Sequence, residues 1–391
     1  MTFQKDLLTV IVPTKERPDT LKHCLRTLVE QKDPRLQIIV SDNVSGPETK
    51  AVFDSFSSDK RLKYIRPESR LGMSEHYDFA LSHADGEWVT IIGDDDGLLP
   101  DAVSDFFELI KGRDVKAVNT CQCKFYWPNE EQGRSSKLTI MTGSGVEIRE
   151  TKPWLMRVLR GNEKFIALPY IYTGGFVHAD VIDEIRKKSG GRFFSSMNPD
   201  IYSGVAVALT IDHYLYSWKP LAIAGISKHS IGAAASTAAW VKEDIKNLPF
   251  YTESAIGYHP ALGNGVVYTI PMDVYESFLR AAPLRKDDMG ITMEDQLALS
   301  IVHAAEDRKD DVYALCKTLA KQNGVDFAKV EQQLTLLKIQ TRVTRTAKNI
   351  IRGIFRTGEG KRQVVKDPAI RNVYDAAEKI REIFKARKKA A

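Results

Sequence analysis

The chain is poor in cysteine and has no long hydrophobic run. Four cysteines occur in 391 residues, at spacings that match neither a disulfide framework nor a zinc site. No apolar stretch approaches the roughly 18 residues that a membrane-spanning helix needs. The apolar run Leu7–Val12 is too short for a secretory signal, and Pro13 interrupts it. We therefore expect a globular protein of the reducing cytoplasm.

Charge is distributed unevenly along the sequence. The formal net charge is only +5, but residues 338–391 contain sixteen Lys and Arg against five Asp and Glu. Within this region Ile350–Arg356 and Ile370–Lys389 interleave apolar with basic residues, which fits helices attracted to an anionic membrane surface at the inner face of the cytoplasmic membrane. The alternative is a helical tail that packs on the rest of the chain or on a second subunit of a homo-oligomer. No groove-reading motif accompanies the charge, so we expect no nucleic-acid partner.

The first hundred residues alternate between strand and helix patterns. Apolar, β-rich runs at 8–12, 37–40, 62–65 and 87–92 alternate with helical patterns at about 18–28, 47–56 and 74–83. Helices between strands imply right-handed crossovers and a mainly parallel α/β sheet. Ligands of such sheets bind beyond the carboxyl ends of the strands. Since Pro13-Thr14, Asp42-Asn43 and Asp94–Asp96 all follow strands, we expect them to meet in one cleft.

The segment Gly93–Gly97 has the sequence Gly-Asp-Asp-Asp-Gly and follows a buried strand pattern. Adjacent carboxylates repel one another and are costly to desolvate, so a cation or a set of donors is expected beside them. At alternate positions, Asp94 and Asp96 offer the hard oxygen ligands that Mg²⁺ or Mn²⁺ prefers. We therefore predict a divalent metal that holds a phosphate. The alternative is a strand that ends in an acidic turn.

Two further segments suit a nucleotide. Asp42 can accept a hydrogen bond from a base imide or a ribose hydroxyl; alternatively, it caps the next helix or forms an Asx turn. Arg70 and Gly72 precede a helix whose expected N-cap is Ser74, and such a helix start attracts phosphate. Neither a P-loop nor a GxGxxG pattern is present in this region.

In order and spacing, these motifs resemble those of family 2 glycosyltransferases with the GT-A fold. The motifs are Thr9–Thr14, Ser41–Asn43, Arg70–Ser74 and Gly93–Asp96, and the resemblance is strong over residues 6–110 and looser to about 235. It implies a Rossmann-like GT-A catalytic domain over residues 1–235. Composition then predicts an aromatic, loop-rich connection over 236–272 and a helical, basic region over 273–391, with helices at 295–321 and 326–338.

The resemblance implies an inverting transfer from a nucleotide sugar, usually UDP-linked, to a glycan or lipid-linked acceptor in bacterial surface polysaccharide synthesis. A Mn²⁺ or Mg²⁺ ion would bridge the diphosphate, with Asp96 and Asp94 as ligands. The implied donor-binding residues are Pro13, Thr14, Glu16, Asp42, Arg70, Gly72, Asp94 and Asp95, with Gly174 and Gly175 on the sugar and acceptor side. A turn before a helix is the alternative for the two glycines. His229 would be a third metal ligand or contact the diphosphate, although a lone histidine is more often structural.

An inverting displacement also needs a general base for the acceptor hydroxyl. In this family the base is commonly an Asp about a hundred residues after the metal motif, and its usual Glu-Asp form is missing here. The best positional match is Asp200, which lies 104 residues after Asp96 and precedes the helical pattern Val205–Leu209. Its alternative role is a first-turn carboxylate that the helix dipole favours. Asp212 is the reserve candidate.

Two other classes of protein are considered. A sugar-1-phosphate nucleotidyltransferase would need a Gly-rich basic loop after the first strand, where this chain has Thr14–Pro18. A catalytically silent scaffold that keeps the fold would account for the altered base motif, but the intact aspartate triplet argues against it.

Overall fold

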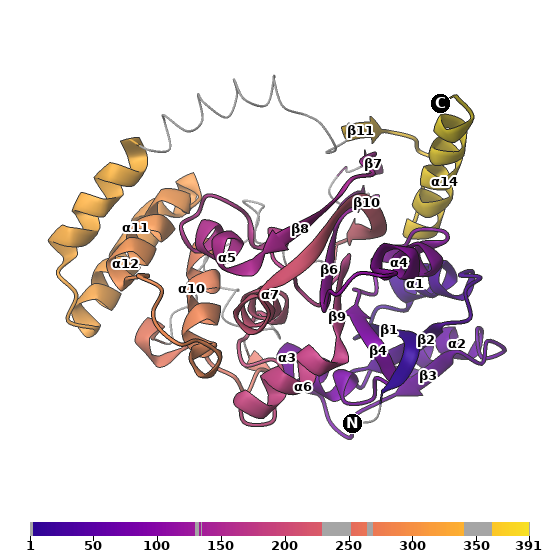
Figure 1. Ribbon diagram of the computed structural model, residues 1–391, viewed down its shortest axis with the longest axis horizontal. Coiled ribbons are helices and arrows are strands. Elements are labelled where there is room, and N and C mark those ends of the chain that lie inside the picture. Colours follow the sequence, from indigo (N-terminus) through magenta and orange to yellow (C-terminus); the bar gives the residue numbers. More distant parts are fainter. Residues whose placement is uncertain are drawn as a thin grey trace.

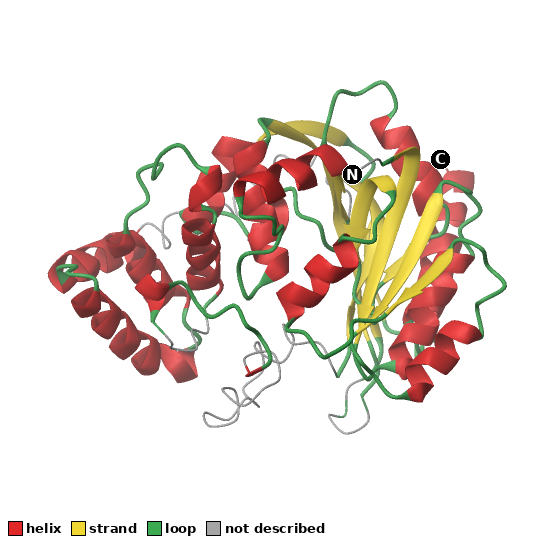
Figure 2. Cartoon of the chain, turned by 90° about the horizontal axis from the view of Figure 1, so that it is seen from below, coloured by secondary structure: helices red, strands yellow, loops and turns green. Residues whose placement is uncertain are grey.

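A single mixed sheet forms the centre of the protein (Figures 1 and 2). The computed structural model describes residues 3–129, 133, 135–228, 252–263, 269–339 and 362–390. The strands are β1 (Gln4–Thr14), β2 (Leu36–Asp42), β3 (Leu62–Ile65), β4 (Gly86–Ile91), β5 (Gly97–Leu98), β6 (Ala117–Tyr126), β7 (Lys137–Met141), β8 (Val146–Glu150), β9 (Gly175–His178), β10 (His213–Ile226) and β11 (Arg362–Val365).

The strand order is β11-β7-β6-β9-β4-β1-β2-β3, and β10 pairs with β5, β6 and β8. β1 pairs in parallel with both β2 and β4, and β2 pairs in parallel with β3, as the alternating pattern predicts. Beyond these four strands, β6 and β10 are parallel, and the other pairs are antiparallel. The parallel half of the sheet is therefore the part that carries the aspartate triplet.

Helices cover both faces of this sheet (Figure 2). They are α1 (Pro18–Val29), α2 (Pro47–Asp54), α3 (Met73–Leu81), α4 (Ala102–Ile110), α5 (Thr151–Leu159), α6 (Ala179–Lys188), α7 (Pro199–Thr210), α10 (Ile270–Arg280), α11 (Met293–His303), α12 (Lys309–Gln322), α14 (Val373–Ala390) and a helix over 327–339. Short 3-10 turns are η1 (Phe165–Ala167), η3 (Pro260–Leu262), η4 (Ala282–Leu284) and η5 (Glu306–Arg308).

The sheet separates two apolar cores. In β1, Leu8, Val10 and Val12 point into one core, which α1, α4 and α14 also line. Ile11 points into the other, which contains residues of α3, α5, α6 and α7. Burial on both faces explains why β1 reads as a continuous apolar run rather than an alternating one.

The carboxyl-terminal region divides between these two cores. Helices α10, α11 and α12 share the core of α5 and α7, whereas Val373, Ala376, Ala377 and Ile380 of α14 are buried against the opposite face, beside α1. Figure 1 shows α14 next to α1 and α4, with α11 and α12 at the far end of the molecule. Residues 273–391, predicted as one helical region, therefore contribute to two different layers.

The placement of α14 favours the packing alternative for its basic tail. Its apolar stripe is buried by protein, so α14 does not present that stripe to a membrane. The second interleaved segment, Ile350–Arg356, lies outside the described residues. Across the described ranges, no helix combines the length and the apolar character needed to cross a bilayer.

One predicted helix is wrong. The pattern at 295–321 predicts a single helix, but α11 ends at His303 and α12 begins at Lys309. Ala304 has an extended backbone, and η5 follows it. The break lets α12 pack on α11, where Cys316 and Leu319 share a core with Leu297 and Ile301. Tertiary packing here prevails over local helix propensity.

Candidate functional site

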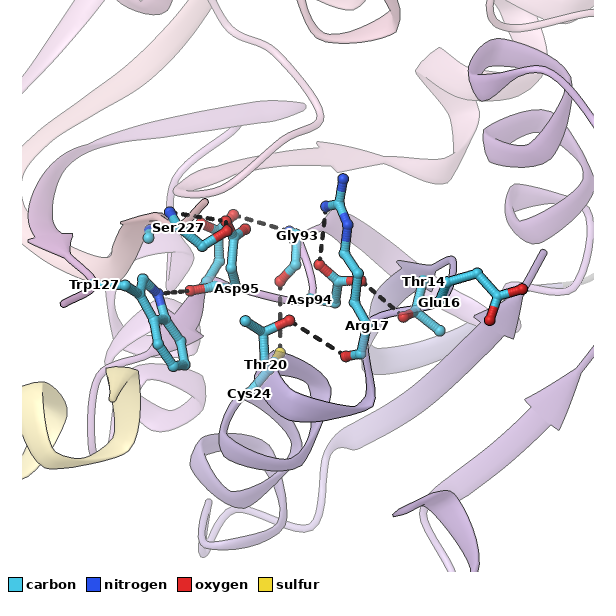
Figure 3. Close-up of polar contacts among 12 residues, drawn as sticks. Thr14, Glu16, Arg17, Thr20, Cys24, Gly93, Asp94, Asp95, Trp127 and Ser227 are labelled. Carbon is cyan, nitrogen blue, oxygen red and sulfur yellow. Dashed lines mark hydrogen bonds and ion pairs between the residues drawn. The ribbon is translucent and has the colours of Figure 1, made fainter. Parts of the chain in front are cut away.

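The carboxyl ends of β1, β2 and β4 lie side by side. Thr14 at the end of β1 pairs with Asp42 at the end of β2, and Ile11 pairs with Ile91 of β4. Beyond these pairs, the Thr14 hydroxyl donates a hydrogen bond to Oδ2 of Asp94 over 2.7 Å (Figure 3). Three of the segments identified in the sequence therefore meet at one edge of the sheet, because parallel strands in register end together.

Asp94 is buried at this edge, and its side chain is only 2% exposed. Besides Thr14, Arg17 from the loop after β1 forms an ion pair with Asp94, with 3.3 Å between Nη1 and Oδ1 (Figure 3). Burial nevertheless raises the pKa of Asp94 to about 6, since the desolvation of the carboxylate outweighs the attraction of Arg17. A further positive charge near Asp94 would therefore stabilise its carboxylate form.

Asp96 is held by three neutral donors. The Gly93 N–H donates to Oδ2 over 2.9 Å, the Gly225 N–H donates to Oδ1 over 2.7 Å, and the Thr173 hydroxyl donates to Oδ2. Burial and the neighbouring Asp95 raise the pKa of Asp96 despite these bonds. Neutral donors fix the direction of the carboxylate, but they do not offset its charge.

Asp95 points to the other side of the loop. Its carboxylate accepts a hydrogen bond from the Ser227 hydroxyl over 2.7 Å, and its carbonyl oxygen accepts one from Nε1 of Trp127 over 3.0 Å (Figure 3). Gly225 passes so close that a Cβ atom there would overlap the Asp95 carbonyl oxygen. Asp95, predicted as a donor-binding residue, thus connects the aspartate loop to β6 and β10.

The chemistry of Asp94 and Asp96 fits a divalent cation whose remaining ligands come from outside the protein. Asp94 and Asp96 supply buried hard oxygen atoms, and the raised pKa values indicate that added positive charge would stabilise both carboxylates. Within the described part of the chain, no group of three or more His, Cys, Asp and Glu side chains is arranged around one point. Mg²⁺ typically uses one or two carboxylates together with phosphate oxygens and water.

Asp42 is fully buried, and both of its carboxylate oxygens are engaged. Oδ1 accepts from the Ser45 N–H over 2.9 Å, whereas Oδ2 accepts from Arg66 over 2.7 Å and from the Tyr64 hydroxyl. The bond from Ser45 closes a local turn, which agrees with the Asx turn expected as an alternative role of Asp42. Gly46 rather than Asp42 is the N-cap of α2. Asp42 lies beside Thr14 at the sheet edge, and its contact with a base remains a proposal.

The start of α3 is covered by another segment of the chain. A Cβ atom on Gly72, the N-cap, would lie 2.6 Å from Cα of Ser254, and Glu75 accepts the N–H groups of Ala255 and Ile256 over 3.0 and 3.1 Å. The predicted phosphate site at this helix start is therefore occupied by residues 253–256. The predicted N-cap Ser74 is instead the second helical residue, and its hydroxyl donates to the Ser196 carbonyl.

Glu16 and Arg70 lie together in front of the strand ends. Arg70 forms an ion pair with Glu16, and Glu16 accepts the Gly46 N–H over 3.0 Å. Glu16 has a φ of 53°, a left-handed backbone that is uncommon for residues other than glycine. Both side chains are about half exposed, which leaves their polar ends accessible to a ligand.

The Gly174-Gly175 pair forms the tight turn before β9. Gly174 has a φ of 89°, and its carbonyl accepts the Thr120 N–H over 2.8 Å. A Cβ atom on Gly175 would overlap the carbonyl oxygen of Tyr170. Backbone geometry accounts for both glycines as a turn before β9, and their place on the sugar and acceptor side stays a prediction.

Asp200 and Asp212 lie at opposite ends of α7. Asp200 is in the first turn, and its Oδ1 accepts the Ile201 N–H over 2.9 Å, whereas Asp212 is exposed beyond the last turn. Burial raises the pKa of Asp200. Burial and Tyr77 raise the pKa of Tyr172, and the charges of Asp96 and Asp200 raise it further. A helix of this length is about 18 Å long, so Asp212 is remote from Asp200.

Several residues of the site carry no recognisable sequence signal. Thr173, Arg17, Tyr64, Arg66 and Ser227 are ordinary polar residues, and their partners lie far away in the sequence. Gly225 offers a weak signal, because a glycine inside a strand often marks a close backbone approach. The predicted residue His229 lies outside the described residues, as do 236–251 and 264–268 of the predicted aromatic connection.

Comparison with known proteins identifies the amino-terminal part. Residues 9–185 match the model of "Glycosyl transferase family 2". A Campylobacter jejuni GalNAc(5)-diNAcBac-PP-undecaprenol beta-1,3-glucosyltransferase is 32% identical over 142 residues, which is 36% of this chain and 43% of that protein. Streptococcus pneumoniae glycosyltransferase GlyG is 22% identical over 191 residues, which is 48% of this chain and 62% of that protein. The chain thus spans less than two thirds of these curated relatives.

A solved structure of S. aureus TarS 1-349 in complex with UDP-GlcNAc is 16% identical, covers 92% of this chain and 97% of that chain, and has a TM-score of 0.47. The family match and the observed α/β sheet with its added carboxyl-terminal helices confirm the predicted GT-A fold class. Residues 9–185 of the chain therefore contain a glycosyltransferase family 2 domain.

Proposed function

We propose that this chain is an inverting glycosyltransferase that moves a sugar from a UDP-linked donor to a glycan or lipid-linked acceptor. The observation that carries the proposal is the meeting of Thr14, Asp42 and Asp94–Asp96 at one sheet edge. In this proposal residues 1–235 contain the catalytic site, and 236–272 shape its acceptor side. The curated relatives suggest an acceptor from surface polysaccharide synthesis, and the name of the Campylobacter enzyme includes a lipid-linked glycan.

Asp94 and Asp96 would hold Mn²⁺ or Mg²⁺, which supplies Lewis-acid stabilisation of the leaving diphosphate when bound. Thr14 and Arg17 orient Asp94, whereas Thr173, Gly93 and Gly225 orient Asp96. Asp42 would accept a hydrogen bond from the uracil imide N–H, and Tyr64 and Arg66 fix its carboxylate. Glu16 and Arg70 would contact the ribose and diphosphate from the mouth of the cleft. His229 is the proposed third ligand.

Asp200 would remove the proton of the acceptor hydroxyl as that oxygen attacks the anomeric carbon. Its place at the start of α7 supports this role, since the helix dipole favours the carboxylate form while burial raises its proton affinity. All four cysteines are unpaired, which supports a reducing compartment such as the cytoplasm. A peripheral position at the membrane would depend on 340–361, which lie outside the described residues.

The test is a comparison of Asp200→Asn with Asp212→Asn. We expect Asp200→Asn to bind UDP-sugar with unchanged affinity but to lose transfer by about a hundredfold or more, because general-base catalysis is removed. Asp212→Asn is the matched control at the far end of the same helix and should transfer normally. Loss of transfer only in Asp212→Asn would show that the base has been assigned wrongly.

The fully hydrogen-bonded state of Asp96 favours a silent scaffold, as does the altered base motif. A catalytically silent protein would bind no donor, or would bind it without any release of UDP. UDP release that requires both Mn²⁺ and Asp96 separates these alternatives without knowledge of the acceptor.

A further inference from the structure

Arg17 lies at the end of the loop after β1, and its guanidinium faces the aspartate loop (Figure 3). Nη1 of Arg17 donates a hydrogen bond to Oδ1 of Asp94 over 3.3 Å. Arg17 is also the N-cap residue of α1, but its side chain makes no capping bond, and its carbonyl accepts the Leu21 N–H over 3.1 Å instead. The side chain of Arg17 is therefore not needed to start α1, and its contact with Asp94 is a separate feature.

Three other cationic side chains near this sheet edge are paired with carboxylates that are not proposed as metal ligands. These ion pairs are Lys15 with Glu253, Arg66 with Asp42, and Arg70 with Glu16. Arg17 differs from these three because its partner, Asp94, is one of the two carboxylates proposed to hold a divalent cation. The charge of Arg17 therefore lies at the same carboxylate that the cation would use.

The bond between Arg17 and Asp94 is longer than is usual for such a pair. Charge-assisted N–H···O bonds are typically about 2.7–2.9 Å long. Arg66 reaches Asp42 over 2.7 Å, whereas the bond from Arg17 to Asp94 is 3.3 Å. The direction of Asp94 is set at its other oxygen, to which the Thr14 hydroxyl donates over 2.7 Å. Arg17 can therefore leave Asp94 without loss of the bond that orients this carboxylate.

Electrostatics make Arg17 and a divalent cation competitors at Asp94. The side chain of Asp94 is 2% exposed and that of Arg17 is 28% exposed, so the guanidinium brings positive charge to a buried carboxylate from a partly accessible position. Burial raises the pKa of Asp94, whereas the charge of Arg17 lowers it. A cation bound to Asp94 would repel the guanidinium, because like charges a few ångströms apart interact strongly in a partly buried site.

We propose that Arg17 binds the donor diphosphate and thereby makes cation binding at Asp94 depend on the donor. With a diphosphate present, the guanidinium moves from Asp94 to a phosphate oxygen, for which its planar set of N–H donors is well suited. With no diphosphate, the guanidinium stays at Asp94 and opposes the cation. This inference rests on the proposed function, in which Asp94 and Asp96 hold Mn²⁺ or Mg²⁺.

This coupling differs in its effects from an ion pair that only stabilises the fold. Because binding couplings are reciprocal, the diphosphate strengthens cation binding by the same factor as the cation strengthens diphosphate binding. Removal of the Arg17 charge should shrink this factor, and it should strengthen the binding of Mn²⁺ alone. Removal of an ion pair that only stabilised the fold would give no gain in Mn²⁺ affinity.

The experiment measures the dissociation constant of Mn²⁺ by electron paramagnetic resonance for the full chain, with and without UDP. Arg17→Met keeps the length of the side chain and removes its charge, so it should bind Mn²⁺ alone about tenfold or more tightly than the wild type. The factor by which UDP strengthens Mn²⁺ binding should be about tenfold smaller in this variant. Arg17→Lys keeps the charge and should stay within about threefold of the wild type. Arg17→Gln serves the same test if Arg17→Met does not fold.

Arg35→Met is the matched control for the loss of charge. Arg35 precedes β2 at the opposite edge of the sheet, where it pairs with Asp33 over 2.6 Å. This variant should bind Mn²⁺ and UDP as the wild type does. If UDP strengthens Mn²⁺ binding in the wild type but Arg17→Met binds Mn²⁺ alone no more tightly than the wild type, this inference alone is overturned. A wild type that binds no Mn²⁺ even with UDP would contradict the proposed function and the inference with it.

Discussion

The Gly225 N–H donates a hydrogen bond to Oδ1 of Asp96 over 2.7 Å, and this bond joins the end of β10 to the loop after β4. The Thr173 hydroxyl holds the other oxygen of the same carboxylate. Residues that lie 77 and 129 positions away in the sequence therefore set the direction of Asp96. A carboxylate that is fixed in this way needs little reorganisation when it binds a cation.

Thr173 should matter for metal-dependent binding although it would not itself be a ligand. Thr173→Val keeps the shape of the side chain and removes the hydroxyl donor, so Asp96 loses one of its three orienting bonds. We expect Mn²⁺-dependent UDP affinity to fall by about ten- to a hundredfold, as for other groups that orient metal ligands. Thr173→Ser keeps the hydroxyl and should bind nearly as the wild type. Calorimetric titration checks this, and equal affinity of all three proteins would refute it.

Gly175 should tolerate no side chain, for a steric reason alone. A Cβ atom would overlap the Tyr170 carbonyl oxygen, so Gly175→Ala must shift the turn before β9. We expect a loss of about 1–3 kcal/mol in unfolding free energy, as for overpacking elsewhere. Gly257→Ala is the control, since a Cβ atom there meets nothing within 4 Å. Urea unfolding of both variants gives the comparison, and equal stability would show that the turn can adapt.

His76 should make the protein less stable in mild acid. Burial lowers the pKa of His76 to about 4, and its Nε2 lies 2.8 Å from the Ser41 hydroxyl, beside Asp42. The pKa of His76 is lower in the folded protein than the value of about 6.5 in the unfolded chain. The stability that the neutral imidazole contributes is therefore fully present above pH 6.5 and is lost as the pH falls toward 4. The linkage predicts a loss on the order of 3 kcal/mol at most.

The comparison is the difference between wild type and His76→Gln in unfolding free energy at pH 7 and pH 4.5. Gln cannot take up a proton, so the variant should lose less stability over this range. Buried carboxyl groups act in the opposite direction, since burial raises the pKa of Asp78 and of Asp94 to about 6. They are present in both proteins and cancel in the difference. Parallel losses in the two proteins would exclude His76 as the cause.

The sequence predicts which residues meet at the sheet edge, because parallel strands in register end at the same edge. The apolar runs set β1, β2 and β4, and their register then brings Thr14 beside Asp42 and Asp94. No local pattern could show that residues 253–256 cover the start of α3, since that contact joins segments about 180 residues apart. The break between α11 and α12 also follows from packing partners rather than from local propensity.

The basic tail illustrates a second limit of sequence reasoning. An apolar stripe on a basic helix fits a membrane surface and a protein surface equally well. In the structure, α1 and the sheet bury the stripe of α14, and Tyr374 at its start donates to Glu30 over 2.9 Å. Hydrophobic periodicity shows that a face is buried, but it does not show what buries it.

Disruption of the α14 stripe should therefore destabilise the catalytic part of the chain. Ile380 is 1% exposed, and Ile380→Asp would place an unpaired charge in that interface. We expect a loss of about 2–5 kcal/mol, similar to that of large core truncations. Lys385→Ala, on the exposed side of the same helix, should change little. Thermal melting measures this loss. An unchanged melting temperature of Ile380→Asp would mean that α14 contributes nothing to stability.

In the proposed function, Asp96 helps to bind a divalent metal that holds a UDP-sugar. The most direct measurement is the melting temperature of wild type and Asp96→Asn with UDP, with Mn²⁺ and with both. A ligand at about 100 times its dissociation constant stabilises by roughly 2.7 kcal/mol, which corresponds to several degrees. We expect a rise in the melting temperature of the wild type only when UDP and Mn²⁺ are present together, and no rise for Asp96→Asn. An equal rise in both proteins, or a UDP-dependent rise without metal, would contradict it.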